Sequence, residues 1–475
     1  MIYRIFFLTF LAVLFLTVSA NAQEIATQKV VGDWQGILDA GAVKLRIVLH
    51  FKVNEKNLLG AMDSPDQGAN GIPIDSVAFE NSTLKFVMSR LGATYEGTLN
   101  GEEIVGKFTQ GGVALPLNLK RGAATAPPKR PQTPVKPYPY DEQEIEFENK
   151  PANIKLAGTL TLPRTKAPFP VVVLITGSGP QDRNETMLGH QPFLVLADHL
   201  TRQGIAVLRF DDRGVAKSKG NFATATSEDF ATDVLSAVAY LKTRKEINPK
   251  KIGLIGHSEG AMIAPMCAVK SNDISFLVMM AGPGVTGEEA LYEQSRLMMI
   301  AEGSTPDEAA RNRKLQEKMF AVLKTEKDES AAEKKLREVV VAHIAEMSEA
   351  QKKLADANPG ALLQQVKAVN TAWTRFFVLY DPRPALRQIK IPVLAINGEL
   401  DLQVSAKQNL PEIAKALKTG GNKNFKIVEL PNLNHLFQPT KTGAFSEYGK
   451  IEETISPAVL TIMSEWIRKQ VSGVR

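Results

Sequence analysis

The sequence predicts an α/β domain with a largely parallel sheet, preceded by a small antiparallel β domain. Three observations lead to this prediction. Apolar and polar residues alternate in the first part of the chain, six prolines fall within residues 122–140, and continuous apolar runs alternate with helical periods after residue 141. With 475 residues, 44% of them hydrophobic, the chain is long enough to bury at least one large core.

Composition excludes several classes of protein. The formal net charge is +6, from 57 basic and 51 acidic residues, and no run of basic residues is present, so we expect no nucleic-acid partner. A charged fraction of 23% is ordinary for a globular protein. The single cysteine, Cys267, excludes an intrachain disulfide and a multi-thiolate metal site.

The first 22 residues have the pattern of an export signal. Arg4 precedes an apolar run over residues 5–18, and the small-x-small sequence Ala20-Asn21-Ala22 follows. The run is shorter than the roughly 20 residues of a spanning helix, which argues against a membrane anchor. We therefore expect cleavage between Ala22 and Gln23, a secreted or periplasmic protein, and no transmembrane segment in the mature chain.

Residues 23–121 are predicted to form an antiparallel β domain, either a barrel or a sandwich. Apolar residues recur with period two, as at Ile47, Leu49 and Phe51, which is typical of half-buried strands. Turn signals occur at residues 70–71 and 100–101, both Asn-Gly. The second predicts a type I′ hairpin with positive φ at both residues. The proline-rich residues 122–140 are then expected to form an extended linker.

Residues 141–475 are predicted to form the α/β domain. Buried strands are expected at 171–175, 205–210, 252–255, 276–280, 391–396 and 425–430. Helices are expected at 191–202, 227–242, 259–269, 406–417 and 457–469. About a hundred residues of helical sequence separate two consecutive strands, far more than one connection needs. We interpret residues 285–390 as an inserted helical cap.

A serine nucleophile is predicted from a strand that leads directly into Gly256-His257-Ser258-Glu259-Gly260 and then into a helical segment. This is the G-x-S-x-G elbow in its required context of strand, turn and helix. The turn is so tight that side chains at the two glycine positions would collide with neighbouring backbone. Ser258 is the candidate nucleophile.

A serine hydroxyl needs a base held by a carboxylate, and in this context the acid and then the base follow the serine along the chain. Asp401 follows one predicted strand, and His435 follows the next. His435 is also the only histidine downstream of Asp401. Glu399 is the alternative acid, although it comes very soon after the strand. We expect Asp401 and His435 to complete the site.

Two backbone donors are needed for the oxyanion of the tetrahedral intermediate. We expect one to be the N–H of Glu259, directly after the nucleophile. The other is expected from the loop after residues 171–175, where small residues allow close approach to substrate. Ser178 N–H is the preferred donor there, and Gly179 N–H is the alternative.

Gly177, Gly179, His257 and Arg183 are candidate substrate-pocket residues. His257 is expected to point away from Ser258, either lining the pocket or bracing the turn. Arg183 could bind a substrate carboxylate or phosphate. The favoured interpretation is instead a salt-bridge network formed with the acidic and basic residues of the segment 211–213. No histidine spacing suggests a metal site, so neither a metal nor a cofactor is expected.

Two strings of residues carry a resemblance to a known family. The stretch 177–184 reads GSGPQDRN, and the stretch 210–214 reads FDDRG. With the elbow, they resemble the serine α/β-hydrolases, in particular EstD-type bacterial carboxylesterases and serine-aminopeptidase-like hydrolases. The resemblance implies the α/β-hydrolase fold and Ser258, Asp401 and His435 as the catalytic triad. Thr176 departs from the pattern, since many relatives have histidine there.

These observations together predict an exported serine hydrolase that cleaves small carboxylic esters with short to medium acyl chains. A serine aminopeptidase, an acyl-thioesterase or an acyltransferase would use the same triad, and the sequence does not separate them. The N-terminal β domain could be a binding module for the cell envelope, a carbohydrate or a lipid. The sequence leaves the oligomeric state open.

Overall fold

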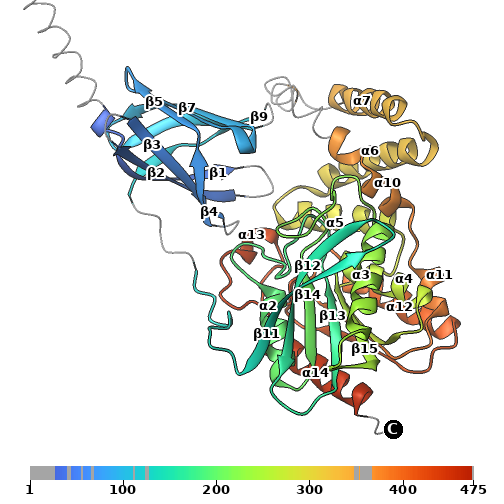
Figure 1. Cartoon of the computed structure of the whole chain (residues 1–475). Helices are drawn as coiled ribbons and strands as arrows, with labels where there is room; N and C mark the ends of the chain where they lie inside the picture. The colour runs from blue at the N-terminus through green and yellow to red at the C-terminus, as the bar shows by residue number, and fades with distance from the viewer. Residues whose placement is uncertain are drawn as a thin grey trace, which may run out of the picture. The chain divides into compact units, whose positions relative to one another are not determined.

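The computed structural model describes residues 27–39, 44–54, 57–65, 69–110, 113–122, 128–346, 352 and 366–472 (Figure 1). The chain divides into two compact units, and the boundary between Pro127 and Pro128 falls inside the proline-rich segment. The predicted export signal at residues 1–22 lies outside the described residues. Within the described parts of the chain, no helix is long and apolar enough to cross a membrane.

The N-terminal unit is one antiparallel sheet, ten-stranded as far as the chain is described. Its strands are β1 (Gly32–Asp39), β2 (Lys44–Asn54), β3 (Asn57–Ser64), β4 (Ala69–Ile74), β5 (Ser76–Glu80), β6 (Thr83–Met88), β7 (Ala93–Asn100), β8 (Glu103–Gln110), β9 (Val113–Pro116) and β10 (Leu119–Arg121), with a short 3-10 helix at Ser89–Leu91. The order is β4-β3-β2-β1-β10-β8-β7-β6-β5, and β9 pairs with β8. Because β3 also contacts β5, the sheet nearly closes on itself. The prediction of a small all-β domain is confirmed.

Alternating apolar residues of this sheet fill a single core. Ile47, Leu49 and Phe51 of β2 are all buried, as the period of two predicts. Trp34 of β1 is fully buried in the same core, and its indole N–H donates to the carbonyl oxygen of Val30 at 2.8 Å. This bond satisfies the one polar atom that the large side chain takes out of water.

Two turn predictions in this unit are wrong. Residues 70–71 lie within β4 rather than between strands, and Gly71 has a φ of 64° there. At the second site, Asn100 pairs with Glu103, so the turn consists of Gly101 and the residue after it. Of the Asn-Gly pair only Gly101 has positive φ, at 63°, and the predicted type I′ geometry is absent. The strand pairing extends one residue further than the Asn-Gly signal implies.

The second unit contains an eight-stranded sheet in the order β11-β12-β14-β13-β15-β16-β17-β18, all within described residues. The strands are β11 (Tyr140–Asn149), β12 (Ile154–Pro163), β13 (Phe169–Ile175), β14 (Ala206–Phe210), β15 (Ile247–His257), β16 (Ile274–Met280), β17 (Val393–Gly398) and β18 (Phe425–Leu430). The six strands from β13 to β18 are mutually parallel, whereas β12 runs antiparallel to both of its neighbours, β11 and β14. The sequence analysis missed β11 and β12. Edge strand β11 has few apolar residues and so lacks the continuous apolar pattern of a buried strand.

Helices cover both faces of this sheet (Figure 1). They are α2 (Pro192–Arg202), α3 (Ser227–Lys242), α4 (Glu259–Lys270), α12 (Ala406–Thr419) and α14 (Pro457–Val471), together with the short α13 (Phe445–Tyr448). Strand β13 shows how the two cores form. Val171 and Val173 belong to the core with α3, α4 and α12, while Val172 and Leu174 belong to the core with α2 and α14. A strand buried on both faces must be apolar throughout, which explains its sequence.

The predicted helical insertion lies between β16 and β17. It contains α5 (Gly287–Ala301), α6 (Pro306–Thr325), α7 (Glu329–Ala345), α10 (Ala372–Leu379) and α11 (Arg383–Gln388). Buried residues from α5, α6, α7 and α10 share a separate core that includes Tyr292, Phe320, Leu336 and Val378. This cap therefore has its own apolar interior beside the sheet.

The second half of the proline-rich segment is anchored to the second unit. The Arg130 guanidinium donates to the carbonyl oxygens of Ile451 at 2.7 Å, Leu188 at 2.8 Å and Gly449 at 2.9 Å. Gln132 donates to the carbonyl oxygen of Ile455 at 2.7 Å. The segment after Pro128 therefore packs as part of this unit.

We expect Arg130→Ala to lower the free energy of unfolding of the second unit by about 2 to 3 kcal/mol, because a hydrogen bond from a charged group contributes about that much. Calorimetry on the full chain should show the unfolding transition of the second unit at a lower temperature. Lys129→Ala is the matched control, since Lys129 is exposed. Equal transition temperatures for the two variants would contradict the anchoring role.

Candidate active site

The β15–α4 junction holds Ser258 in a strained conformation. Ser258 has φ 54° and ψ −117°, which a residue with a side chain rarely adopts. A Cβ at Gly256 would lie 2.0 Å from the carbonyl oxygen of Gly260, and a Cβ at Gly260 would lie 2.2 Å from the carbonyl oxygen of Ile175. Neither position can therefore carry a side chain, and the turn has the crowding that the sequence predicts for a nucleophile elbow.

Asp401 and His435 are joined at the same edge of the sheet. Asp401 follows β17, His435 follows β18, and His435 Nδ1 lies 2.8 Å from Asp401 Oδ2. The other oxygen of Asp401 accepts bonds from the backbone N–H groups of Gln403 and Val404, both at 2.8 Å. Both side chains of the pair are buried. The alternative acid, Glu399, is exposed and accepts a bond from the backbone of the loop after β18 instead.

His257 connects the serine turn to the His435 loop. Its Nε2 lies 3.0 Å from the carbonyl oxygen of His435, and the two imidazole rings are 4.7 Å apart. Its Nδ1 lies 2.9 Å from Glu185 Oε1. His257 is buried, and it does not belong to the pocket lining described below. The turn that carries Ser258 therefore contacts the His435 loop through His257.

The loop after β13 packs directly against the serine. A Cβ at Gly177 would lie 3.2 Å from Ser258 Cβ. The backbone N–H of Gly177 is already occupied, since it donates to Glu185 Oε1 at 2.8 Å. Ser178, the next residue, is exposed, and Gly179 has a φ of 97°. On the other side of the serine, Glu259 is the first residue of α4, where backbone N–H groups point out of the helix.

The Glu259 side chain forms a polar contact that the sequence analysis did not predict. Its Oε1 accepts bonds from Ser227 Oγ at 2.6 Å and from the indole N–H of Trp373 at 2.8 Å. Burial raises the pKa of this carboxyl group, and the hydrogen bonds from Ser227 and Trp373 only partly oppose the shift. Trp373 belongs to α10, so this contact joins the cap to the elbow. Nothing in the local spacing of these residues indicates that they meet.

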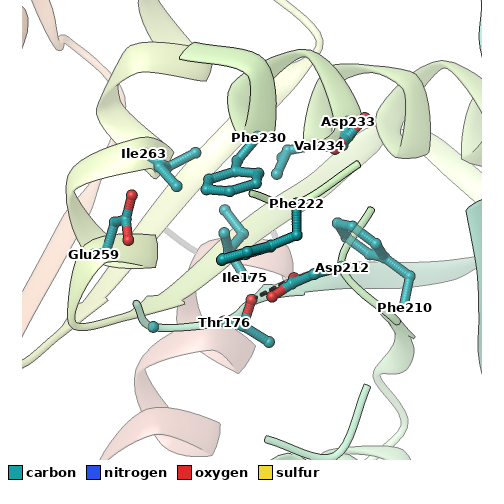
Figure 2. Close-up of a pocket in the computed structure, with 11 residues that line it drawn as sticks. Ile175, Thr176, Phe210, Asp212, Phe222, Phe230, Asp233, Val234, Glu259 and Ile263 are labelled. Atoms are coloured by element: carbon teal, nitrogen blue, oxygen red, sulfur yellow. Dashed lines mark hydrogen bonds between the residues drawn. The ribbon is translucent and has the colours of Figure 1, made fainter. Parts of the chain in front are cut away.

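A small pocket, partly open to solvent, lies beside the elbow (Figure 2). Its lining residues are Ile175, Thr176, Gly177, Phe210, Asp212, Phe222, Phe230, Asp233, Val234, Glu259 and Ile263. The rings of Phe222 and Phe230 stack at 5.2 Å. The lining is mainly apolar, and carboxyl groups supply most of its polar atoms.

Asp212 is a second carboxyl group of this pocket with a raised pKa. Burial raises its pKa to about 8, although it accepts hydrogen bonds from Thr176 Oγ1 at 2.7 Å and from the Gln181 N–H at 2.9 Å. The carboxyls of Glu259 and Glu185 raise it further. Thr176, the residue that departs from the family pattern, is therefore used to hold Asp212.

Arg183 lies in a buried ion-pair network. Its guanidinium contacts Asp211 at 2.8 Å and Glu144 at 2.9 Å. Arg213 makes a separate buried pair with Asp233 at 2.7 Å. Arg183 therefore connects β11, the loop after β13 and the loop after β14, and Arg213 connects the loop after β14 to α3. Of these pairs, Arg183–Asp211 is the one that the sequence analysis favoured. Asp212, between Asp211 and Arg213 in the chain, accepts bonds from Thr176 and Gln181 instead.

Metal-ligating side chains do not cluster in the described part of the chain, where no group of three or more His, Cys, Asp or Glu residues could hold an ion. Cys267 on α4 is fully buried in the core of the hydrolase unit. Burial raises the pKa of its thiol, which keeps the thiol neutral.

We expect Asp212→Asn to change how stability depends on pH. The folded-state pKa of about 8 lies above the ordinary value of 3.8. The folded protein therefore retains a proton that the unfolded chain has lost, and stability falls as the pH rises through this window. An amide reproduces the protonated acid, since it can donate to Thr176 and accept from Gln181. The melting temperature of the variant relative to wild type should rise from about pH 4 to about pH 8 and stay constant above that.

Asp211→Asn is the control for this experiment. Burial opposes ionisation of Asp211, but its bonds to Arg183 prevail and lower its pKa. It therefore contributes stability above its ordinary pKa, and its loss should destabilise the protein throughout the neutral range. If the melting temperatures of Asp212→Asn and wild type differed by the same amount at every pH, the raised pKa of Asp212 would be refuted.

Comparisons with known proteins agree with this fold. The family model described as serine aminopeptidase, S33, matches residues 190–438, which is more than half of the chain. Esterase EstD of Thermotoga maritima is 26% identical over 306 residues, covering 64% of this chain and 61% of the relative. The match thus spans less than two thirds of that relative's length.

Two solved structures are also similar. The esterase Pf2001 of Pyrococcus furiosus has a TM-score of 0.41 at 16% identity, covering 70% of this chain and 93% of the other. Est1E of Butyrivibrio proteoclasticus, solved with ferulic acid, has a TM-score of 0.39 at 17% identity, and the match covers 69% of this chain and 99% of the other. The family match includes the elbow, Asp401 and His435. The chain belongs to the serine aminopeptidase S33 family of α/β-hydrolases.

Proposed function

We propose that the protein is an exported serine hydrolase that cleaves carboxylic esters with short to medium acyl chains through an acyl-enzyme on Ser258. The observation that carries the proposal is the 2.8 Å bond between His435 and Asp401 beside the strained Ser258 turn. The esterase activity named for the Thermotoga maritima relative supports the choice of ester over other acyl substrates.

The proposed reaction has two stages. Ser258 Oγ attacks the ester carbonyl carbon while His435 Nε2 accepts the hydroxyl proton, and His435 then gives that proton to the departing alkoxide. Water next attacks the acyl-enzyme with His435 again as base, which releases the carboxylic acid and restores the serine. Asp401 accepts a bond from His435 Nδ1–H throughout. Its two backbone donors hold the carboxylate in place for this task.

The N–H groups of Glu259 and Ser178 are the proposed oxyanion donors. Glu259 N–H lies at the start of α4, where the helix dipole favours negative charge. Gly177 N–H is occupied by Glu185, which supports Ser178 as the donor of the loop after β13.

The lining of the pocket supports an apolar group of the substrate on this side of the elbow. The side chains of Phe210, Phe222, Phe230 and Val234 offer no hydrogen-bond donors, so they would favour a hydrocarbon chain.

A serine aminopeptidase is the second candidate, because the carboxyl groups of Asp212 and Glu259 line the same pocket. A substrate ammonium placed between them would stabilise their ionised forms. A thioesterase or acyltransferase would use the same triad. For the N-terminal β domain, we propose attachment to the cell envelope, a carbohydrate or a lipid.

We expect Asp401→Asn to lower kcat by about 10⁴-fold, because the amide favours the wrong tautomer of the histidine. Glu399→Gln is the matched control and should retain near wild-type rates, since Glu399 contacts only the loop backbone. Steady-state kinetics on a p-nitrophenyl ester would measure both variants. A larger loss of kcat in Glu399→Gln than in Asp401→Asn would identify Glu399 as the acid instead.

The substrate class can be tested with p-nitrophenyl esters of increasing chain length beside aminoacyl p-nitroanilides. We expect higher kcat/KM on the esters and complete loss of turnover in Ser258→Ala. Faster turnover of the anilides would select the aminopeptidase. Ester hydrolysis that survives in Ser258→Ala would reject Ser258 as the nucleophile.

A further inference from the structure

Glu185 and His257 form a second buried carboxylate–imidazole pair beside Asp401 and His435. The bond between Glu185 Oε1 and His257 Nδ1 is 2.9 Å long, and both side chains are at most 6% exposed. Each partner also makes one contact outside the pair. Glu185 Oε1 accepts the Gly177 N–H, and His257 Nε2 faces the carbonyl oxygen of His435. The pair therefore bridges the loop after β13 and the loop after β18.

The hydrogen-bond pattern fixes where protons must be. A carbonyl oxygen only accepts, so His257 Nε2 must carry a hydrogen toward His435. A further proton must lie between His257 Nδ1 and Glu185 Oε1, because a bare nitrogen and a bare carboxylate oxygen would repel each other. Burial alone would lower the pKa of His257, but the nearby Glu185 outweighs it and raises the pKa above its ordinary value. The pair therefore holds two protons, one on His257 Nε2 and one between His257 Nδ1 and Glu185 Oε1.

Backbone strain occurs at both ends of this arrangement. Glu185 has a φ of 54°, as does Ser258, which follows His257 directly. A left-handed conformation costs a non-glycine residue about 1 to 2 kcal/mol, so it persists only where surrounding contacts fix it. The turn before Glu185 supplies such contacts: Glu185 N–H donates to the Asp182 carbonyl oxygen, and Asp182 Oδ1 accepts from the N–H groups of Asn184 and Thr186.

We propose that the Glu185–His257 pair is a positioning element of the hydrolase, which sets the oxyanion loop and the His435 backbone together. By holding Gly177 N–H, Glu185 orients the peptide that leads to Ser178. By holding the His435 carbonyl, His257 fixes the backbone of the base. The inference rests on the proposed function, and neither residue contacts the reacting atoms.

Both contacts at once require this second proton, because Gly177 N–H and His257 Nδ1 bond the same oxygen of Glu185. In Glu185→Gln, an amide oxygen at this place can accept from Gly177, but a neutral imidazole has a single N–H and can then bond either that oxygen or the His435 carbonyl. If the amide NH2 instead donates to His257 Nδ1, Gly177 N–H loses its acceptor. One of the two loops would lose its contact although the volume of the side chain is unchanged.

The test uses the full chain with Glu185→Gln, His257→Gln and the double variant. His199→Gln is the matched control, because His199 is a half-buried histidine that bonds Ser464 on α14, on the face of the sheet covered by α2. Three quantities are measured: the rate of Ser258 labelling by a fluorophosphonate, kcat and KM on a p-nitrophenyl ester, and the melting temperature.

We expect Glu185→Gln to slow labelling and lower kcat by about 100-fold, because small displacements of catalytic groups cost about that much. KM should change by less than about threefold, since substrate binding is not removed. The double variant should be no slower than the slower single variant, because both substitutions break one unit. The control should lose only thermal stability.

The proposal would be overturned if folded Glu185→Gln kept a labelling rate and a kcat within about threefold of wild type. It would also be overturned if the fold-losses in kcat of the two single variants multiplied in the double variant. If Glu185→Gln does not fold, His257→Gln decides by the same criteria. A wild-type protein that the fluorophosphonate does not label at Ser258 would instead refute the proposed function itself. The two failures are therefore distinguishable.

Discussion

Strand β15 must turn into α4 at a single residue, and the rest of the site depends on this constraint. The turn forces Ser258 to a φ of 54°, and its N–H is held by the Met280 carbonyl oxygen at 2.8 Å. The backbone of the following helix approaches the end of β13 so closely that only glycine fits at position 260. The same approach brings the loop after β13 against the serine, so one packing contact positions both the proposed oxyanion donors and the proposed nucleophile.

The parallel sheet supplies the other components because the carboxyl ends of its strands meet at one edge. Asp401 and His435 follow neighbouring strands there, although the whole cap separates Asp401 from the serine along the chain. The cap can vary in size without moving either residue, because β16 and β17 pair directly. Trp373 shows how the cap nevertheless takes part: its indole N–H reaches the Glu259 carboxyl at the start of α4.

Much of this arrangement was predictable because it is encoded locally. Helix α3 has the predicted bounds 227–242, and it begins with Asp229 reaching back to the N–H of Thr226 in a capping box. Parallel strands buried on both faces were equally clear from their continuous apolar runs. Glu185, Asp212 and the Glu259 side chain were not predicted, because their roles arise from contacts between separate loops. The N-terminal turn errors have a different cause, since strand pairing outweighed the local Asn-Gly preference.

Four buried carboxyl groups surround the elbow, and they are accommodated in two ways. Asp401 and Glu185 each pair with an imidazole and also accept backbone N–H bonds. Asp212 and Glu259 have no cationic partner among the contacts found in the described chain, and burial raises the pKa of both. The two histidines lie on one side of the site, whereas burial on the pocket side favours protonated acids among phenylalanine rings. In the proposed mechanism, this division would separate proton transfer from substrate binding, and the pocket would suit a neutral group unless a substrate ammonium restored the charge.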